Sequence, residues 1–374
     1  MPTNDQLLLA LAAVIDPNTG KDFVASKAIK NLTVEGGVDG GVGGGVVKFD
    51  LQLAYPAKSQ HAEFETALRT AALAVSGVSS VTVTTSTRVE SHAVQRGVQL
   101  LPSVKNIIAV ASGKGGVGKS TTAVNLALAL SAEGANVGLL DADIYGPSVP
   151  MMMGISGRPE SPDGKNMEPL ENHGIQVMSI GFLVEPDQAM IWRGPMATQA
   201  LDQLLKQTNW RDLDYLIVDM PPGTGDIQLT LSQRVPLTGA VIVTTPQDIA
   251  LLDARKGIKM FEKVGVPILG IVENMAVHVC SQCGHAEHIF GQDGGKKMAL
   301  EFGMDYLGGL PLDMQIRLQA DGGTPTFSNI LMPFLASSSA MSCGVVTMTA
   351  PVMGTRWLRV SWMSPVPGGM STIK

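Results

Sequence analysis

One glycine-rich segment limits the fold of this chain more than any other part of it. Residues 113–120, GKGGVGKS, fit the pattern G-x-x-x-x-G-K-S/T, which is typical of a loop that holds phosphate with its backbone N–H groups. The segment follows an apolar run and precedes a stretch with helical spacing. This is the strand–loop–helix context that the pattern requires, so the sequence predicts a nucleotide-binding α/β domain.

Apolar runs that alternate with helical stretches extend this prediction along the chain. The runs are residues 107–112, 137–143, 175–180, 215–219, 240–245 and 268–272. Nearly continuous apolar strands are typical of a parallel sheet that is covered on both faces. The fold class predicted for residues 106–326 is therefore α/β, a doubly wound and mostly parallel sheet.

A small α+β domain is predicted to precede this sheet, over residues 1–90. Apolar and polar residues alternate in 47–55, helical spacing follows in 61–76, and 78–87 has the pattern of a further strand. The glycine-dominated run 36–46 is interpreted as the tip of a hairpin. Residues 91–105 are polar and are predicted to link the two domains.

Composition and charge exclude several classes of protein. The net charge of −6 argues against binding to nucleic acid or to an anionic membrane. Three cysteines cannot all pair within one chain, and the N-terminus has no basic start with a small-residue cleavage site, so we expect a cytoplasmic protein. The tail 327–374 has no acidic residue and no regular period, and its structure is not predicted.

The loop residues and two carboxylates suggest a site for ATP and Mg²⁺. Lys119 is expected to reach the β/γ-phosphates, while Ser120 ligates Mg²⁺. Asp219 ends an apolar run and is placed to hold the magnesium shell. Asp143, rather than Asp141, is expected to orient the attacking water, although both could simply cap the next turn. The predicted nucleotide-binding residues of the loop are Gly113, Lys114, Gly115, Gly116, Val117, Gly118, Lys119, Ser120 and Thr121.

Lys114 is a second lysine in the same loop. Its backbone would curl around the phosphate, so its side chain is expected to point away from its own nucleotide. The residue chemistry leaves two interpretations equally open: a solvated lysine, or a catalytic charge supplied to the nucleotide of a second subunit.

A Cys-x-x-Cys pair, Cys280 and Cys283, indicates a metal or redox site. Two thiolates provide half of a four-ligand site. His285 and His288 could complete a zinc site within the chain, or the pair could be a redox dithiol. In the third alternative, two subunits related by two-fold symmetry bring four cysteines to one [4Fe–4S] cluster.

The motifs together resemble the deviant-Walker P-loop ATPases related to MinD and ParA, and within these the Mrp (ApbC) iron–sulfur cluster carriers. The resemblance rests on KGGVGKST, DADIYGPS, DMPPGTGD and ENMA and on the cysteine pair, and it covers most of 1–326. It implies a nucleotide-sandwich homodimer in which Lys114 acts in trans. It also implies that Asn274, otherwise a turn residue at a strand end, contacts adenine, and that Cys280 and Cys283 hold a dimer-bridging [4Fe–4S] cluster.

The chain departs from the family pattern at both ends. Asp16-Pro17 matches the D-P-E start of the small iron–sulfur assembly domain, but Asn18 replaces the Glu, and the tail lacks the usual alanine-rich helix. The expected function is that of an ATP-dependent carrier with slow ATP hydrolysis. It would pass its cluster to apo iron–sulfur proteins and work with cluster-assembly factors. The alternatives are a spatial-organising ATPase of the MinD/ParA kind, a zinc-binding P-loop ATPase, and a reductase resembling the nitrogenase iron protein.

Overall fold

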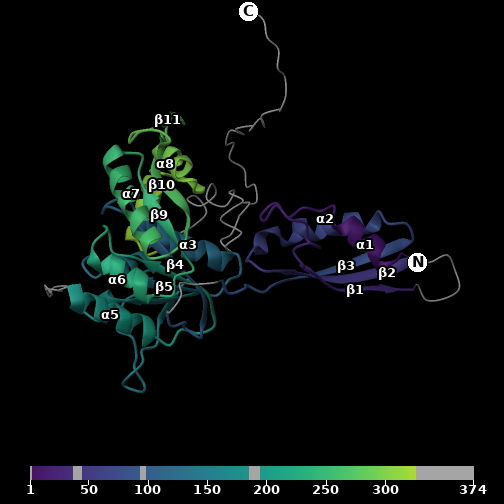
Figure 1. Cartoon of the computed structure of the whole chain (residues 1–374), viewed down its shortest axis with the longest axis horizontal. Helices are drawn as coiled ribbons and strands as arrows, with labels where there is room; N and C mark the ends of the chain where they lie inside the picture. Colours follow the sequence, from purple (N-terminus) through teal and green to yellow (C-terminus); the bar gives the residue numbers. More distant parts are fainter. Residues whose placement is uncertain (1, 37–43, 93–97, 185–193, 326–374) are drawn as a thin grey trace, which may run out of the picture.

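The computed structural model describes residues 2–36, 44–92, 98–184 and 194–325, and these residues form two units (Figure 1). The unit that contains the N-terminus has helices α1 and α2 and strands β1 to β3. The second unit contains the remaining helices and strands. Within the described residues, no helix is long and apolar enough to cross a membrane.

The first unit is a three-stranded sheet with two helices. Its elements are α1 (Asn4–Leu11), β1 (Ile29–Glu35), β2 (Gly45–Leu53), α2 (His61–Leu73) and β3 (Val78–Thr87). β2 lies in the middle, antiparallel to β1 and parallel to β3. Alternate residues of β2 are buried, Phe49 and Leu51 among them, and they share a core with Phe64 and Leu68 of α2. The alternation of apolar and polar residues in the sequence therefore indicates a sheet with one buried face.

The central sheet of the second unit has the strand order β11-β10-β9-β4-β8-β5-β7-β6, with β12 paired to β10. Neighbouring strands are parallel except for β6 and β11, which are antiparallel to β7 and β10. The strands are β4 (Val104–Ala111), β5 (Val137–Asp141), β6 (Leu170–Asn172), β7 (Ile175–Ser179), β8 (Leu213–Asp219), β9 (Gly239–Thr244), β10 (Ile268–Val279), β11 (Ala286–Glu287) and β12 (Tyr306–Pro311).

Helices connect these strands and pack on the sheet (Figure 1). They are α3 (Lys119–Ala132), α4 (Val149–Met152), α5 (Gly194–Lys206), α6 (Asp226–Arg234), α7 (Asp248–Lys263), α8 (Gly294–Phe302) and α9 (Met314–Asp321). Helix α3 is buried continuously from Thr122 to Leu130 against β4, β5 and β8. Its alanines allow this close approach. The expected doubly wound, mostly parallel α/β sheet with a small preceding α+β domain is confirmed.

The structure differs from the sequence-based expectation at several element boundaries. The apolar run 268–272 is only the first part of β10, which continues to Val279 and so includes Asn274. Strand β1 was not predicted, because most of its residues are exposed, none is fully buried, and its apolar residues do not alternate regularly with polar ones. Most of the glycine run 36–46 and the tail 327–374 lie outside the described residues.

Candidate functional site

The phosphate-binding loop runs from the end of β4 at Ala111 to the start of α3 at Lys119. Gly118 has a φ of +81°, a left-handed conformation that favours glycine, and it immediately precedes the helix. Gly113 is required for a different reason. A Cβ atom at this position would lie 2.6 Å from the backbone nitrogen of Ala254 and closer still to the carbonyl group of Asp253 in helix α7.

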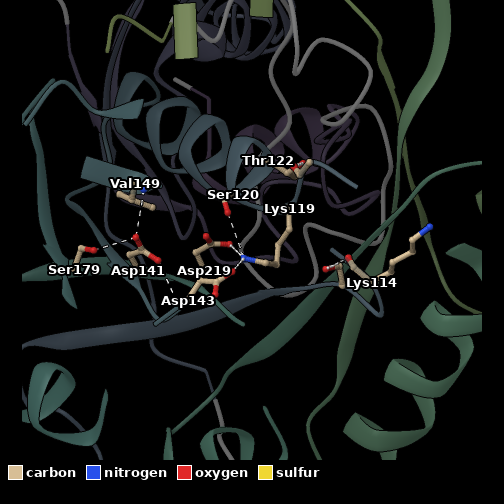
Figure 2. Close-up of polar contacts among 11 residues, drawn as sticks. Lys114, Lys119, Ser120, Thr122, Asp141, Asp143, Val149, Ser179 and Asp219 are labelled. Atoms are coloured by element: carbon tan, nitrogen blue, oxygen red, sulfur yellow. Dashed lines mark hydrogen bonds and ion pairs between the residues drawn. The ribbon is translucent and has the colours of Figure 1, made fainter. Parts of the chain in front are cut away.

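Lys119 is buried at the base of the loop, where it lies near two carboxylates, Asp219 at the end of β8 and Asp143 just after β5. Its Nζ donates to Oδ1 of Asp219 at 2.5 Å and to Oγ of Ser120 at 3.3 Å. Oδ2 of Asp143 lies 3.9 Å from the same ammonium group. Figure 2 shows these side chains converging from the ends of β5 and β8 and from the start of α3. The structure thus brings together Lys119, Ser120, Asp143 and Asp219, as the sequence suggested.

Asp141 is a buried carboxylate that holds the residues around this cluster in place. It is completely buried and accepts hydrogen bonds from the backbone N–H of Asp143 and Val149 and from the hydroxyl of Ser179. Burial, followed by the neighbouring charge of Asp219, raises the pKa of Asp141 to about 7. Burial also raises the pKa of Asp143. Asp141 was the alternative to Asp143 for orienting water; in the structure its hydrogen bonds hold the loop that carries Asp143.

Magnesium chemistry fits one unsatisfied atom of the cluster. Oδ2 of Asp219 is buried and has no hydrogen-bond donor among the described residues, although Oδ1 of the same carboxylate is bound by Lys119. A buried anionic oxygen with no donor is suited to a water in the shell of a hard cation. Ser120 provides a hydroxyl oxygen beside it. The residues present therefore fit a bound Mg²⁺.

Lys114 lies apart from this buried cluster. Its side chain is exposed and points away from Lys119 (Figure 2). Its carbonyl oxygen accepts a hydrogen bond from the Ser112 hydroxyl at 2.9 Å, which fixes the backbone rather than the ammonium group.

A cavity of about 200 Å³ is lined by loop residues from Ser112 to Thr121 and by Asp143.

Asn274 connects strand β10 to the phosphate-binding loop. Its side-chain amide donates to the carbonyl oxygen of Val117 at 2.8 Å, and its own oxygen accepts from the N–H of Met275. The side chain is nearly buried and lies directly against Gly118. The expected contact with adenine remains a prediction. Asn274 lies within β10 rather than at its end, and the next residue, Met275, has a φ of +56°.

The cysteine pair lies between β10 and β11, at the far end of the strand that carries Asn274. The N–H of Cys280 donates to the carbonyl of His285, and the N–H of Gly284 donates to the carbonyl of Cys280, which closes a tight turn. Cys280 is partly exposed and Cys283 is exposed, and both are free thiols. N–H groups of Cys283 and Gln282 lower the pKa of the Cys280 thiol.

The nearby histidines make contacts of other kinds. Nδ1 of His288 donates to the carbonyl of Ala276 at 2.7 Å, and Nδ1 of His278 donates to the carbonyl of Leu312 at 3.0 Å. His285 lies 3.9 Å from Glu287. Across the described part of the chain, no three His, Cys, Asp or Glu side chains are placed to hold one metal ion. The geometry therefore gives no support to a zinc site completed by His285 and His288.

Comparison with known proteins agrees with this geometry. Residues 103–339 match the ParA model described as NUBPL iron-transfer P-loop NTPase, which covers more than half of the chain. The chain belongs to this family. Residues 4–84 match a second model, described as an iron–sulfur cluster assembly protein. The resemblance to this family, inferred from the motifs, is thereby confirmed.

Individual relatives of this NUBPL-type chain carry matching names. It is 62% identical over 252 residues to the iron–sulfur cluster carrier protein of Pseudomonas fragi, covering 67% of this chain and 88% of that protein. It is 45% identical over 363 residues to the iron–sulfur cluster carrier protein of Synechocystis, covering 94% of this chain and all of that protein. A solved structure, a nucleotide-binding protein from Archaeoglobus fulgidus in complex with ADP, is 38% identical with a TM-score of 0.54, covering 59% of this chain and 88% of that one.

Proposed function

We propose that this chain is an ATP-dependent carrier whose cargo, a [4Fe–4S] cluster, bridges two copies of the chain at Cys280 and Cys283. The homodimer binds MgATP at both phosphate-binding loops, hydrolyses it slowly and passes the cluster to apo iron–sulfur proteins in the cytoplasm. The family assignment and the names of the relatives support the iron–sulfur part of this proposal.

The cysteine turn is the observation that carries the proposal. Cys280 and Cys283 are free and accessible, and N–H groups around Cys280 favour its thiolate, which is the form that ligates iron. A cluster of this type takes four thiolate ligands, but the turn provides two and the described residues add no third. A second copy, related by two-fold symmetry, provides the missing two. Four ligands shared between two chains at an exposed tip also allow release of the cargo.

The phosphate-binding loop provides the nucleotide chemistry. Backbone N–H groups from Gly113 to Lys119 would surround the phosphates, and Lys119 would exchange its contact with Asp219 for the β/γ-oxygens. Ser120 and the free oxygen of Asp219 would hold Mg²⁺, which supplies positive charge opposite the phosphates when bound. Asp143 would orient water.

The exposed side chain of Lys114 suits a role on the partner's nucleotide. It is not engaged with its own loop cluster, so it is free to reach across an interface (Figure 2). A charge supplied in trans in phosphoryl transfer contributes about 10³–10⁵ in rate. Hydrolysis would therefore be slow until two copies meet.

Strand β10 connects the phosphate-binding loop to the cysteine turn. Asn274 touches the loop at Val117, and Cys280 lies six residues further along the same chain segment. Asp143 is held by Asp141, which lies beside Asp219. A change in the loop on nucleotide binding would shift the relative stability of two dimer arrangements and so alter the affinity for the cluster.

Anaerobic reconstitution with iron and sulfide tests the proposal. The wild-type chain should take up four iron atoms per dimer and give the broad visible absorbance of a [4Fe–4S] cluster, and Cys280→Ser should lose it. Cys343→Ser is the matched control, because Cys343 is the third cysteine and has no role in the proposal. Equal iron uptake by Cys280→Ser, or a cluster on a chain that remains monomeric by light scattering, would refute the ligand assignment.

A further inference from the structure

A wide groove is lined mostly by the N-terminal unit, at the end of its sheet where β2 and β3 terminate and β1 begins, and Lys105 of β4 completes its lining. It has a volume of about 1070 Å³ and is lined by Lys30 from β1, Leu53 at the end of β2 and Arg88 just after β3. The carboxyl ends of parallel strands are a recurrent place for ligands in open α/β sheets. None of the residues that line it belongs to the phosphate-binding cavity or to the cysteine turn.

Positive charge dominates this groove. Its cationic lining residues are Lys21, Lys27, Lys30, Arg88 and Lys105, and we call it the basic groove. Lys105 is paired with Asp214 at 2.7 Å, but the other four have no carboxylate within ion-pair distance in the described part of the chain. Such a concentration is unexpected in a chain whose net charge is −6.

The carboxylates of the basic groove do not neutralise these cations. Asp16 is buried, and its oxygens accept hydrogen bonds from the hydroxyls of Tyr55 and Thr19 and from the N–H of Asn18. Asp16 therefore holds together the buried residues beneath the groove. Glu90 is the other carboxylate of the lining. Four unpaired cations outnumber the two carboxylates of the lining, one of which is buried, and so leave the surface positive and able to attract an anionic partner.

The chemistry of the lining favours an acidic polypeptide over a small phosphate compound. Phosphate cradles are built from glycines and inward-facing N–H groups, but the described lining contains no glycine. The Tyr55 hydroxyl of the lining already donates to Asp16. The charged groups that remain are Arg88 and exposed lysines, and the lysines are flexible point charges suited to carboxylates spread along a chain. The volume also lies at the upper limit of small-molecule pockets, which hold about 300–1,000 Å³.

We propose that the basic groove binds an acidic segment of a partner protein. This goes beyond the proposed carrier function, because it assigns a docking site, lined mostly by the N-terminal unit, that uses neither nucleotide nor iron. The lysines and Arg88 would steer the acidic segment towards the groove and fix its position, and the binding would weaken as salt screens the charges.

The test is fluorescence anisotropy with a labelled octaglutamate peptide and the full chain, without nucleotide or iron, at low salt. Lys21→Glu/Arg88→Glu should bind at least about tenfold more weakly than Lys165→Glu/Lys259→Glu. This control makes the same change in net charge at exposed lysines outside the groove. Labelled octaglutamine should not bind, and Lys21→Gln/Arg88→Gln should give an intermediate loss if the reversed variant folds poorly.

Three results would overturn the proposal. The first is equal binding of octaglutamate by the groove variant and its control. The second is no binding by the wild-type chain at low salt. The third is tight binding of inorganic tripolyphosphate that the groove substitutions abolish, with no binding of the peptide, which would make the groove a phosphate site. Nucleotide affinity and iron uptake, measured on the same variants, should be unchanged. A failure of the docking proposal can then be told apart from a failure of the proposed carrier function.

Discussion

Replacing Gly113 by alanine tests whether the first glycine of the loop is required by helix α7. The added Cβ would lie 2.6 Å from the backbone nitrogen of Ala254 and closer still to the Asp253 carbonyl. Normal contact between such atoms needs about 3.5–4.0 Å, so loop and helix would have to separate by more than about 1 Å. The helix cannot easily move, because Ala254, Ile258 and Phe261 on its inner face are fully buried.

The magnitude follows from this rigidity. Overpacking typically costs about 1–3 kcal/mol, and we expect about 3 kcal/mol here, because backbone atoms rather than a flexible side chain must yield. For a domain of this size each kcal/mol lowers Tm by about 2–4 °C, so Gly113→Ala should melt about 6–12 °C lower. Gly115→Ala is the matched control in the same loop, since its Cβ would have no atom within 4 Å.

The assay is thermal unfolding of both variants without nucleotide, followed by circular dichroism. Gly115→Ala should differ from the wild-type free energy of unfolding by no more than about 0.5 kcal/mol. If the two variants melt at the same temperature, the close approach of the loop to α7 does not constrain residue 113, and the reasoning is wrong.

Three further outcomes are expected. Lys119→Ala should abolish ATP binding in equilibrium dialysis, since it removes the ammonium group buried between Asp143 and Asp219; retained affinity would place the phosphates elsewhere. Lys114→Ala should lower turnover by about 10³-fold or more with little change in ATP affinity, because the side chain acts on the partner's nucleotide; unchanged turnover returns it to a solvated lysine. The free energy of unfolding should fall as pH rises from about 4 to about 7, because the pKa of Asp141, raised to about 7 in the folded state, makes the folded state bind more protons than the unfolded state in this range. In urea titrations at several pH values, an Asp141→Asn variant should show a weaker dependence of this free energy on pH. An unchanged dependence would contradict this origin.

The phosphate-binding loop and its carboxylates were predictable because their information is local. The pattern formed by Gly113, Gly118 and Lys119 can be recognised within one short segment of the sequence, and Asp219 lies at the end of an uninterrupted apolar strand. Parallel strands place their carboxyl ends at one edge of the sheet, so the meeting of Lys119 with Asp143 and Asp219 follows from the strand pattern. Asp141 and Asp143 both follow the same apolar run, so the sequence could not show that Asp141 holds the loop while Asp143 faces Lys119.

Long-range contacts are the part that the sequence did not contain. Asn274 meets Val117 across 157 residues, and no local pattern specifies that contact. The basic groove is likewise assembled from the region around Lys21, the start of β1 and the residue after β3, each of which alone is an ordinary solvated lysine or arginine.

Residue type and spacing along this chain determined its α/β class, its phosphate-binding loop and its cysteine pair, because strand burial, tight turns and thiol ligation depend on near neighbours. Only the tertiary structure decided which oxygen of Asp219 is left without a donor, why residue 113 must lack a side chain and where unpaired cations gather. These features depend on the packing of segments that are distant in sequence, and burial there sets the cost of every unsatisfied charge or added atom.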